Sequence, residues 1–291
     1  MKVAFIGAGN IGGAMAACLA RKRFDLTVCD MNDAALEAFR ELGANTTVNV
    51  ADCASADVVV IMVATDRQVR SVAMGDDGNG GLLAHVDAAR PPAVVIMSSV
   101  LPATVRDVAA AMAQKNVRVI DAPVSGGHVA AANGLLTIMV GGEASDLTRV
   151  RPLLDALGSN IVQCGPLGAG EAMKIVNNIV GVTNMILMTE AARLALELGM
   201  DVDWVAGVME KSSGRNFATR DFTAHKMLYR HNTTSPEALH ALLAVCRKDL
   251  ALATTLSESA GLSMPLLEAI KAALDTTPDE AIAESWRKLA K

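Results

Sequence analysis

Lys2-Val-Ala-Phe-Ile-Gly-Ala-Gly-Asn-Ile-Gly-Gly13 is the stretch that decides the expected fold of the first half of the chain. A short apolar strand runs directly into a Gly-x-Gly-x-x-Gly turn, and an alanine-rich helix follows to about Arg21. A second strand, Leu26–Asp30, then ends in an aspartate. A glycine motif alone is a weak signal, but strand, glycine turn, helix, strand and acid in this order are typical of a dinucleotide-binding unit.

Each residue of the turn has a predicted physical role toward the cofactor. Gly7 permits the tight turn, Gly9 lets the backbone approach the pyrophosphate, and Gly12 lets the helix pack closely on the strand. The helix begins at Asn10 and Ile11, so its free N–H groups and its positive dipole end face the phosphates. We therefore assign these five residues to cofactor binding.

Asp30 predicts which nicotinamide cofactor is used. A carboxylate at this position accepts hydrogen bonds from the ribose hydroxyls of NAD and repels the additional phosphate of NADP. The next three residues, Met31, Asn32 and Asp33, include no arginine that would favour that phosphate. We expect NAD, with NADP less favoured.

Further strands and helices alternate after Asp30, which predicts an α/β domain with a doubly wound, mostly parallel, Rossmann-like sheet. The expected elements are a helix at Asp33–Leu42, strands at Val58–Val63, Ala93–Met97 and Val117–Asp121, and a helix at Thr104–Gln114. Ligands bind outside the carboxyl ends of the strands in such sheets. The residues there that we assign to the cofactor cleft are Val63, Ala64, Thr65 and Ser99.

The second half of the chain shows only helical patterns. We expect a cofactor-binding domain at residues 1–164 and an all-α substrate and oligomerisation domain at 165–291, joined by a long helix. The predicted helices are Glu171–Leu198, Asp203–Lys211, Pro236–Ser259, Pro265–Ala273 and Asp279–Leu289. Polar residues interrupt the apolar run of the first, which argues against a membrane span.

Composition excludes several classes of protein. The chain has 291 residues, 52% of them hydrophobic, and a formal net charge of −5, which argues against a nucleic-acid partner. Its five cysteines are scattered without a CxxC pair, and no secretory signal opens the sequence. We expect a cytoplasmic protein with no membrane partner and no metal site.

Lys174 and Asn178 are the candidate catalytic pair. They stand four residues apart on one face of the long helix. Apolar surroundings lower the pKa of a lysine, which makes it usable as an acid or base near neutral pH. A lysine that reaches out to solvent, with an ordinary polar neighbour, is the alternative interpretation.

Two other stretches are candidates for substrate binding. Ser125-Gly126-Gly127 follows a strand, and adjacent glycines can turn successive N–H groups toward one carboxylate. Arg215 lies in a polar loop and either holds a second anionic group or faces solvent. A simple loop is the alternative for the glycine stretch. We add Asn177 to the substrate-binding group.

Taken together, these stretches resemble the β-hydroxyacid dehydrogenase family over essentially the whole chain. The motifs that carry the resemblance, in order, are the N-terminal glycine turn, Asp121-Ala-Pro-Val-Ser-Gly-Gly127, the segment from Gly165 through Lys174 to Asn178, and Lys248-Asp249-Leu250. The sequence departs from the family pattern at Ile11, Val63-Ala64 and Ile96, where the family often has Met, Leu-Pro and Asp.

The resemblance implies a role for each matching position. Lys174 corresponds to the catalytic lysine, Asn178 to the asparagine that holds substrate, and Ser125–Gly127 to the substrate-binding stretch. Lys248 corresponds to a residue that closes on the cofactor, and Ser99 to a position on the nicotinamide side. Family members are dimers or tetramers with the active cleft between the two domains, so a homodimer or homotetramer is implied.

The predicted function is NAD-dependent oxidation of a small 3-hydroxy acid, similar to 3-hydroxyisobutyrate, to its semialdehyde or 3-oxo acid. Lys174 would act as the general acid or base in hydride transfer. One alternative is an NADPH-dependent reductase of tartronate or succinic semialdehyde. From another class, the chain could be a dinucleotide-binding regulator without catalysis, which would need neither Lys174 nor Asn178.

Overall fold

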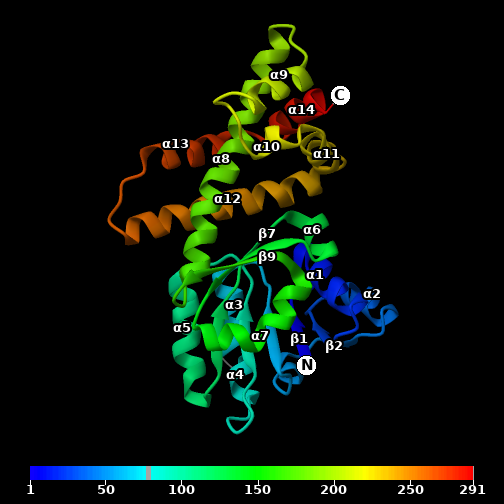
Figure 1. The fold of residues 1–291 in the computed structure, drawn as a ribbon, viewed down its shortest axis with the longest axis vertical. Helices are drawn as coiled ribbons and strands as arrows, with labels where there is room; N and C mark the ends of the chain where they lie inside the picture. The colour runs from blue at the N-terminus through cyan, green and yellow to red at the C-terminus, as the bar shows by residue number, and fades with distance from the viewer. Residues whose placement is uncertain (77–79, 291) are drawn as a thin grey trace. The chain divides into compact units, whose positions relative to one another are not determined.

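The computed structural model describes residues 1–76 and 80–290 of the chain (Figure 1). The chain divides into two compact units, Met1–Lys174 and Ile175–Lys291. The division falls inside helix α8, Ala169–Glu197, whereas the boundary predicted from the sequence precedes residue 165.

Unit 1 is built on one nine-stranded sheet. Its strands are β1 Lys2–Ile6, β2 Asp25–Cys29, β3 Asn45–Thr47, β4 Val58–Ile61, β5 Ala93–Ile96, β6 Arg118–Asp121, β7 Val124–Ser125, β8 Leu136–Gly141 and β9 Gly158–Gly165. The order is β3-β2-β1-β4-β5-β6-β8-β7, with β9 paired to β8. Pairing is parallel from β3 to β6 and antiparallel where β8 meets β6 and β7, so the predicted mostly parallel, doubly wound sheet is confirmed.

The strand order reverses between β1 and β4, and this places the expected crevice at the carboxyl ends of these two strands. Helices cover both faces of the sheet, as a parallel sheet requires. Alternate residues of β1 show the two layers. Val3 and Phe5 pack with helices α1 (Asn10–Arg21) and α7 (Ala144–Leu157), whereas Ala4 and Ile6 pack with helices α3 (Asp66–Met74) and α5 (Pro102–Met112). Hydrophobic residues in both layers are therefore buried, which explains the continuous apolar runs in the sequence.

The helical segments of unit 1 before α8 are α1 Asn10–Arg21, η1 Asp33–Leu36, α2 Glu37–Glu41, η2 Val50–Cys53, α3 Asp66–Met74, α4 Gly81–His85, α5 Pro102–Met112, η3 Ala113–Lys115, α6 Gly127–Asn133 and α7 Ala144–Leu157. The single helix predicted over Asp33–Leu42 is instead a 3₁₀ turn followed by a short α-helix. The strand predicted to Val63 ends at Ile61, because Thr65 already caps α3 by accepting the N–H of Gln68.

Unit 2 is helical throughout its described residues, as predicted. After α8 come α9 Val202–Glu210, α10 Phe217–Arg220, α11 Phe222–Asn232, α12 Pro236–Ser259, α13 Pro265–Thr276 and α14 Asp279–Leu289. The bounds of α12 and α14 match the prediction. Helices α10 and α11 were not predicted, although Asn216 and Asp221 provide N-terminal caps for them.

Helix α8 is long and apolar enough to cross a membrane by length and composition alone, with one-third of its most apolar window buried. Such a helix also suits the core of a globular protein. Its first turns belong to unit 1 and its remainder to unit 2. Glu171, Lys174, Asn177 and Asn178 all lie in its first half, and this polar content favours the second interpretation.

A buried polar network stabilises unit 2. His225 Nε2 and the Tyr229 hydroxyl are 3.0 Å apart, and Trp286 Nε1 donates to Thr189 Oγ1 at 3.0 Å. The Thr189 and Tyr229 hydroxyls, 3.5 Å apart, connect the two pairs. Burial lowers the pKa of His225 from its ordinary value of 6.5 to about 4. The folded state therefore holds this histidine neutral at physiological pH.

This histidine predicts how stability depends on pH. Between about pH 6.5 and 4 the unfolded chain binds a proton at His225 that the folded state excludes, so its contribution is complete above pH 6.5 and is lost as pH falls. The free energy of unfolding should fall by up to about 1.4 kcal/mol per pH unit in that window from this group. Urea unfolding at pH 7 and pH 5 should show a smaller pH dependence for His225→Gln than for the wild type. The exposed control His85→Gln should keep the wild-type slope, and an unchanged slope in His225→Gln would refute this account.

Candidate active site

The glycine turn after β1 has the geometry that its predicted roles require. Gly7 has φ +105°, and a Cβ there would lie 2.2 Å from the carbonyl oxygen of Met62. A Cβ at Gly12 would lie 2.3 Å from the Gly7 carbonyl oxygen, so α1 starts directly against the turn. A Cβ at Gly9 would meet no described atom within 4 Å. The turn is therefore closed on the protein side and open beside Gly9, as a cradle for a phosphate must be.

The start of α1 supplies the donors for that cradle. Gly9 occupies the N-cap position, and among the described residues no side chain caps this end or places an acid in its first turn. Asn10 and Ile11 are the first helical residues, and Asn10 is exposed. Helix N-terminal N–H groups combined with the helix dipole bind anions well, so these residues fit a dinucleotide pyrophosphate.

Asp30 lies directly after β2 and is joined to the turn. Its Oδ2 accepts the N–H of Ala8 at 2.7 Å, and its Oδ1 accepts the N–H of Asn32 at 2.9 Å. Arg40, the next arginine along the chain, forms an ion pair with Asp33. The carboxylate is thus held at the end of β2, where a ribose would meet it, and the following arginine is engaged elsewhere.

Ser98 connects the ends of the two central strands β4 and β5. Its Oγ accepts the N–H of Val63 at 2.8 Å and donates to the Ile61 carbonyl oxygen at 3.4 Å. The N–H groups of Ala64 and Thr65 are bonded to Gln68 Oε1, within the capping box of α3. The sequence predicts that the segment Ser98-Ser99 lines the cofactor cleft, with Ser99 as the cofactor-binding residue, but it does not predict that Ser98 joins the two strand ends. The signal available was only a serine directly after a buried strand.

The loop Ser125–Gly127 connects β7 to α6. Gly126 has φ +142° and Gly127 has φ +72°, so two successive residues adopt conformations that favour glycine. A Cβ at Gly126 would also lie 2.7 Å from the Cβ of Ala130. Ser125 at the end of β7 is partly exposed. This backbone suits the predicted carboxylate-binding loop, and binding itself stays a prediction.

Lys174 lies in the second turn of α8 and is the last residue of unit 1, with 8% of its surface exposed. It therefore shares a compact unit with the glycine turn, Asp30, Ser99 and Ser125. A charged lysine is seldom this buried without partners. Burial of this kind favours the acid–base interpretation over a lysine that extends into solvent.

Asn178 lies one turn further along α8 and is fixed within unit 2. Its Nδ2 donates to Asp249 Oδ2 at 2.7 Å, and its Oδ1 accepts from Asn177 Nδ2 at 3.1 Å. Lys248 Nζ lies 3.3 Å from the other carboxylate oxygen of Asp249. From the sequence, the pair of charges on α12 could have been solvated. The structure instead buries Asp249, to 7% exposure, against the candidate substrate-binding amide.

Arg215 lies in the loop between α9 and α10, in unit 2. Its Nε is 3.1 Å from Glu210 Oε1, and its side chain is 69% exposed. The structure therefore gives this arginine a carboxylate of its own chain. A role in binding substrate stays a prediction, and a substrate carboxylate would have to compete with Glu210.

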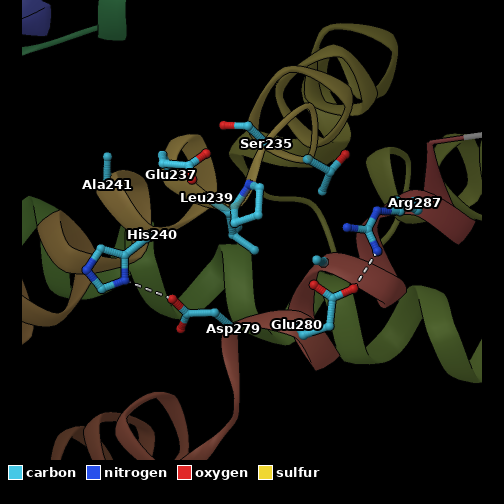
Figure 2. A pocket seen from close by; sticks show the side chains of 11 residues that line it. Ser235, Glu237, Leu239, His240, Ala241, Asp279, Glu280 and Arg287 are labelled. Carbon is cyan, nitrogen blue, oxygen red and sulfur yellow. Dashed lines mark hydrogen bonds and ion pairs between the residues drawn. The ribbon is translucent and has the colours of Figure 1, made fainter.

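A separate groove of about 510 Å³ lies in unit 2 between the start of α12 and α14 (Figure 2). His240 Nδ1 lies 3.1 Å from Asp279 Oδ2, and Arg287 Nη1 lies 2.7 Å from Glu280 Oε1 (Figure 2). None of the predicted site residues lines this groove. Four of its side chains thus form two pairs with one another.

Comparison with known proteins also divides the chain into two parts. Residues 2–165 match the model of the NAD-binding domain of 6-phosphogluconate dehydrogenase. Residues 168–285 match the model described as NAD-binding of NADP-dependent 3-hydroxyisobutyrate dehydrogenase. The two matched regions meet where β9 gives way to α8.

Individual relatives and solved structures extend the likeness. The chain is 34% identical to an NAD-dependent L-serine dehydrogenase of Pseudomonas aeruginosa, over 91% of this chain and 88% of that protein. It is 39% identical to a 3-hydroxyisobutyrate dehydrogenase of the same organism, over 74% and 71%. A crystal structure of 3-hydroxyisobutyrate dehydrogenase from Salmonella typhimurium has a TM-score of 0.79 at 26% identity, with 95% of this chain and 93% of that chain covered.

The family matches, the relatives and the fold lead to one conclusion. The matched regions together span almost the whole chain, and the sequence-based resemblance is confirmed. The chain belongs to the β-hydroxyacid dehydrogenase family and is an NAD(P)-dependent hydroxyacid dehydrogenase.

Proposed function

We propose that the protein oxidises a small 3-hydroxy acid, of the 3-hydroxyisobutyrate kind, to its semialdehyde or 3-oxo acid with NAD as the hydride acceptor. The observation that carries this proposal is a buried lysine, Lys174, in the same compact unit as the glycine turn. A protein that only binds a dinucleotide has no need of a buried lysine there. The activities named for the relatives, on 3-hydroxyisobutyrate and on L-serine, support the substrate class.

In the proposed reaction, the glycine turn and Asp30 would hold NAD, which would supply the acceptor for hydride from the carbinol carbon. Lys174 takes the proton of the substrate hydroxyl as the carbonyl forms, and in the reverse direction it returns that proton to the developing alkoxide. The lysine needs an unprotonated form for oxidation. Proton transfer is therefore the contribution of the protein to the chemical step, together with orientation of the substrate.

Two groups would hold the substrate. The amide of Asn178 stands one helical turn from Lys174, and its orientation is fixed by Asp249. The positive-φ backbone of Gly126 and Gly127 supplies N–H groups for the carboxylate. A substrate held at its hydroxyl and its carboxylate would present a single carbinol hydrogen to the cofactor, and this accounts for a 3-hydroxy acid rather than a simple alcohol.

Asp249 gives a test of substrate positioning. Asp249→Ala frees the Asn178 amide, so we expect kcat/KM for the hydroxy acid to fall by about 10-fold or more. Asp249→Asn keeps an acceptor for Asn178 and should lose less. Steady-state kinetics at saturating NAD measure both, with Glu258→Ala, an exposed change on the same helix, as the control. Equal activity of Asp249→Ala and the control would show that the Asp249 bond is not used.

We propose further that the enzyme is a cytoplasmic homodimer or homotetramer. Large apolar side chains are exposed in unit 2, among them Leu187, Leu194 and Trp204 at 59%, 62% and 64%. Leu187 and Leu194 stand seven residues apart on one face of α8, as residues in a helix interface do. The free cysteines suit a reducing compartment. Light scattering coupled to gel filtration should give two or four times the chain mass of 30.2 kDa.

The substrate class is tested by following reduced-nicotinamide absorbance for the purified protein. The panel contains 3-hydroxyisobutyrate, glycerate, 3-hydroxypropionate, L-serine and threonate, each with NAD and with NADP. We expect at least one of these acids to give turnover with NAD. Activity only with NADPH and a semialdehyde, in the reverse direction, would support the reductase alternative instead. NAD binding without turnover across the panel would support a regulator.

A further inference from the structure

The residue that precedes α8 is Gly168, which has no side chain to cap the helix. Asp121, at the end of β6, supplies the missing carboxylate. Its Oδ1 accepts the N–H of Gly168 at 2.7 Å, and its Oδ2 accepts the N–H of Glu171 at 2.8 Å. Both bonds are buried, and Asp121 is fully buried. The helix that carries Lys174 is thus fastened to the central sheet at its beginning.

Small residues surround this carboxylate closely. A Cβ at Gly141, which pairs with Asp121 across β8 and β6, would lie 2.4 Å from Oδ1. A Cβ at Gly170 would lie 2.8 Å from Oδ2 and 2.3 Å from the carbonyl oxygen of Met139. Any side chain at either glycine would displace the carboxylate or the helix. The first turn of α8 is therefore in direct contact with the sheet, and its position has little freedom.

Glu171 makes a second connection from the same turn. It is fully buried, and its Oε2 accepts the N–H of Val100 at 3.1 Å. Val100 directly follows Ser99, the residue predicted to lie on the nicotinamide side of the cofactor. Glu171 also precedes Lys174 by three positions, which places both on neighbouring points of one helix face. One buried carboxylate thus connects the lysine-bearing turn to the loop after β5.

The electrostatic environment of Asp121 determines how well it accepts its two hydrogen bonds from the first turn of α8. Burial raises the pKa of Asp121, and hydrogen bonds from the N–H groups of Gly168 and Glu171 oppose that rise. A carboxylate at a helix N-terminus is also stabilised by the helix dipole. No water competes for the two bonds at a fully buried site. The N–H groups of Gly168 and Glu171 and the carboxylate of Asp121 therefore depend on one another as hydrogen-bond partners.

We propose that Asp121 and Glu171 are positioning residues of the reaction. Together they fix the first turn of α8 against β6 and against the loop that carries Ser99, and so determine where Lys174 meets the substrate hydroxyl. This inference rests on the proposed role of Lys174 as the acid or base. Proton transfer and hydride transfer depend steeply on such placement, since a displacement of about 1 Å can cost about 10²-fold in rate.

The main experiment is a double-mutant cycle between Asp121→Asn and Lys174→Ala. The amide of Asp121→Asn can accept only one of the two N–H bonds and presents an NH₂ group to the other donor. We expect kcat to fall about 10- to 100-fold in the wild-type background, with the dissociation constant for NAD within about twofold of the wild-type value. In the Lys174→Ala background, the same change should lower kcat by less than about twofold, because the residue being positioned is absent.

Glu171 provides an independent pair of variants in case Asp121→Asn does not fold. Glu171→Ala removes the acceptor for the Val100 N–H, and Glu171→Gln retains an acceptor oxygen at the same place. We expect kcat to fall about 10-fold for the alanine variant and clearly less for the glutamine variant. Asp155→Asn, the same chemical change as Asp121→Asn at an exposed ion pair on α7, should leave kcat unchanged.

The outcomes separate this inference from the proposed function. If Lys174→Ala retains wild-type turnover, the proposed function is wrong regardless of Asp121. If Lys174→Ala lowers kcat as expected but stays measurable, and Asp121→Asn lowers kcat by the same factor in both backgrounds, Asp121 acts independently of Lys174 and the positioning role is overturned. Equal kcat for Glu171→Ala and Glu171→Gln, or a loss confined to NAD affinity, would overturn it as well.

Discussion

Replacing Lys174 with alanine is expected to lower kcat by about 10² to 10⁴-fold, the usual contribution of general acid–base catalysis. The reason is that Lys174 is the proposed acid or base and is the titratable side chain of the second turn of α8. The helix itself should persist, because alanine is the best helix former. Binding of NAD, measured by titration, should stay near the wild-type value, since the glycine turn and Asp30 are unchanged.

Two further measurements separate loss of the amine from loss of structure. The cavity left in Lys174→Ala should admit a small primary amine, so methylamine should restore part of the turnover in a concentration-dependent way. Lys211→Ala, at an exposed lysine that ends α9, should keep wild-type kinetics. Near-normal turnover of Lys174→Ala in the absence of amine would remove the lysine from the mechanism.

The second large effect is expected at Asp30. Asp30→Asn keeps an oxygen that can accept the N–H of Ala8 and gives up the bond from the N–H of Asn32. The glycine turn should therefore be preserved while the negative charge is lost. Repulsion of the 2′-phosphate then disappears, and the charge-assisted bonds to the ribose hydroxyls weaken. We expect the ratio of kcat/KM with NAD to kcat/KM with NADP to fall by roughly 10- to 100-fold. The change comes from the weakening of two charge-assisted bonds and the loss of one repulsion.

The control for Asp30 is Asp25→Asn at the exposed beginning of the same strand. It changes the net charge equally but lies at the other end of β2, so the cofactor ratio should not move. A wild-type enzyme that uses NAD and NADP equally well would contradict the assignment before any variant is made. A ratio unchanged in Asp30→Asn would mean that the carboxylate orders the turn without meeting the ribose.

The elements with strong local signals could be predicted from the sequence. Helix α12 begins where Ser235 caps it and Pro236 occupies its first turn, and α14 begins after Pro278. Helix α1 follows a glycine turn and ends at Arg21 as expected. In each case, residues within a few positions of the boundary determine it, so a single sequence contains the information.

Contacts between distant segments could not be predicted in the same way. Strand β8 lies antiparallel to β6, and the two strands pair through Asp121 and Gly141. Asp249 was predicted only as one half of a charge pair, and its bond to Asn178 spans 71 residues. Glu171 carried no assigned role, since a glutamate in the first turn of a helix is ordinarily a solvated residue. Only the fold shows that it is buried.

The same difference between local signals and long-range contacts applies to the candidate site. The glycine turn and the acid after β2 could be located from the sequence, because motif spacing and backbone requirements are local, and their roles toward the cofactor stay predictions. Lys174 was selected from its apolar surroundings, but the carboxylates that connect its helix to the sheet and to the loop after β5 were not. A sequence therefore indicates candidate residues more readily than the distant residues that hold them in place.

The most direct test of the account follows deuterium from the substrate to the cofactor. The best substrate of the hydroxy-acid panel is prepared with deuterium in place of every hydrogen on its carbinol carbon, and the NADH formed by the wild-type protein is analysed by mass spectrometry. We predict one deuterium in each NADH, with none released to water. Unlabelled NADH, or no NADH from any acid of the panel, would contradict hydride transfer from a 3-hydroxy acid to NAD.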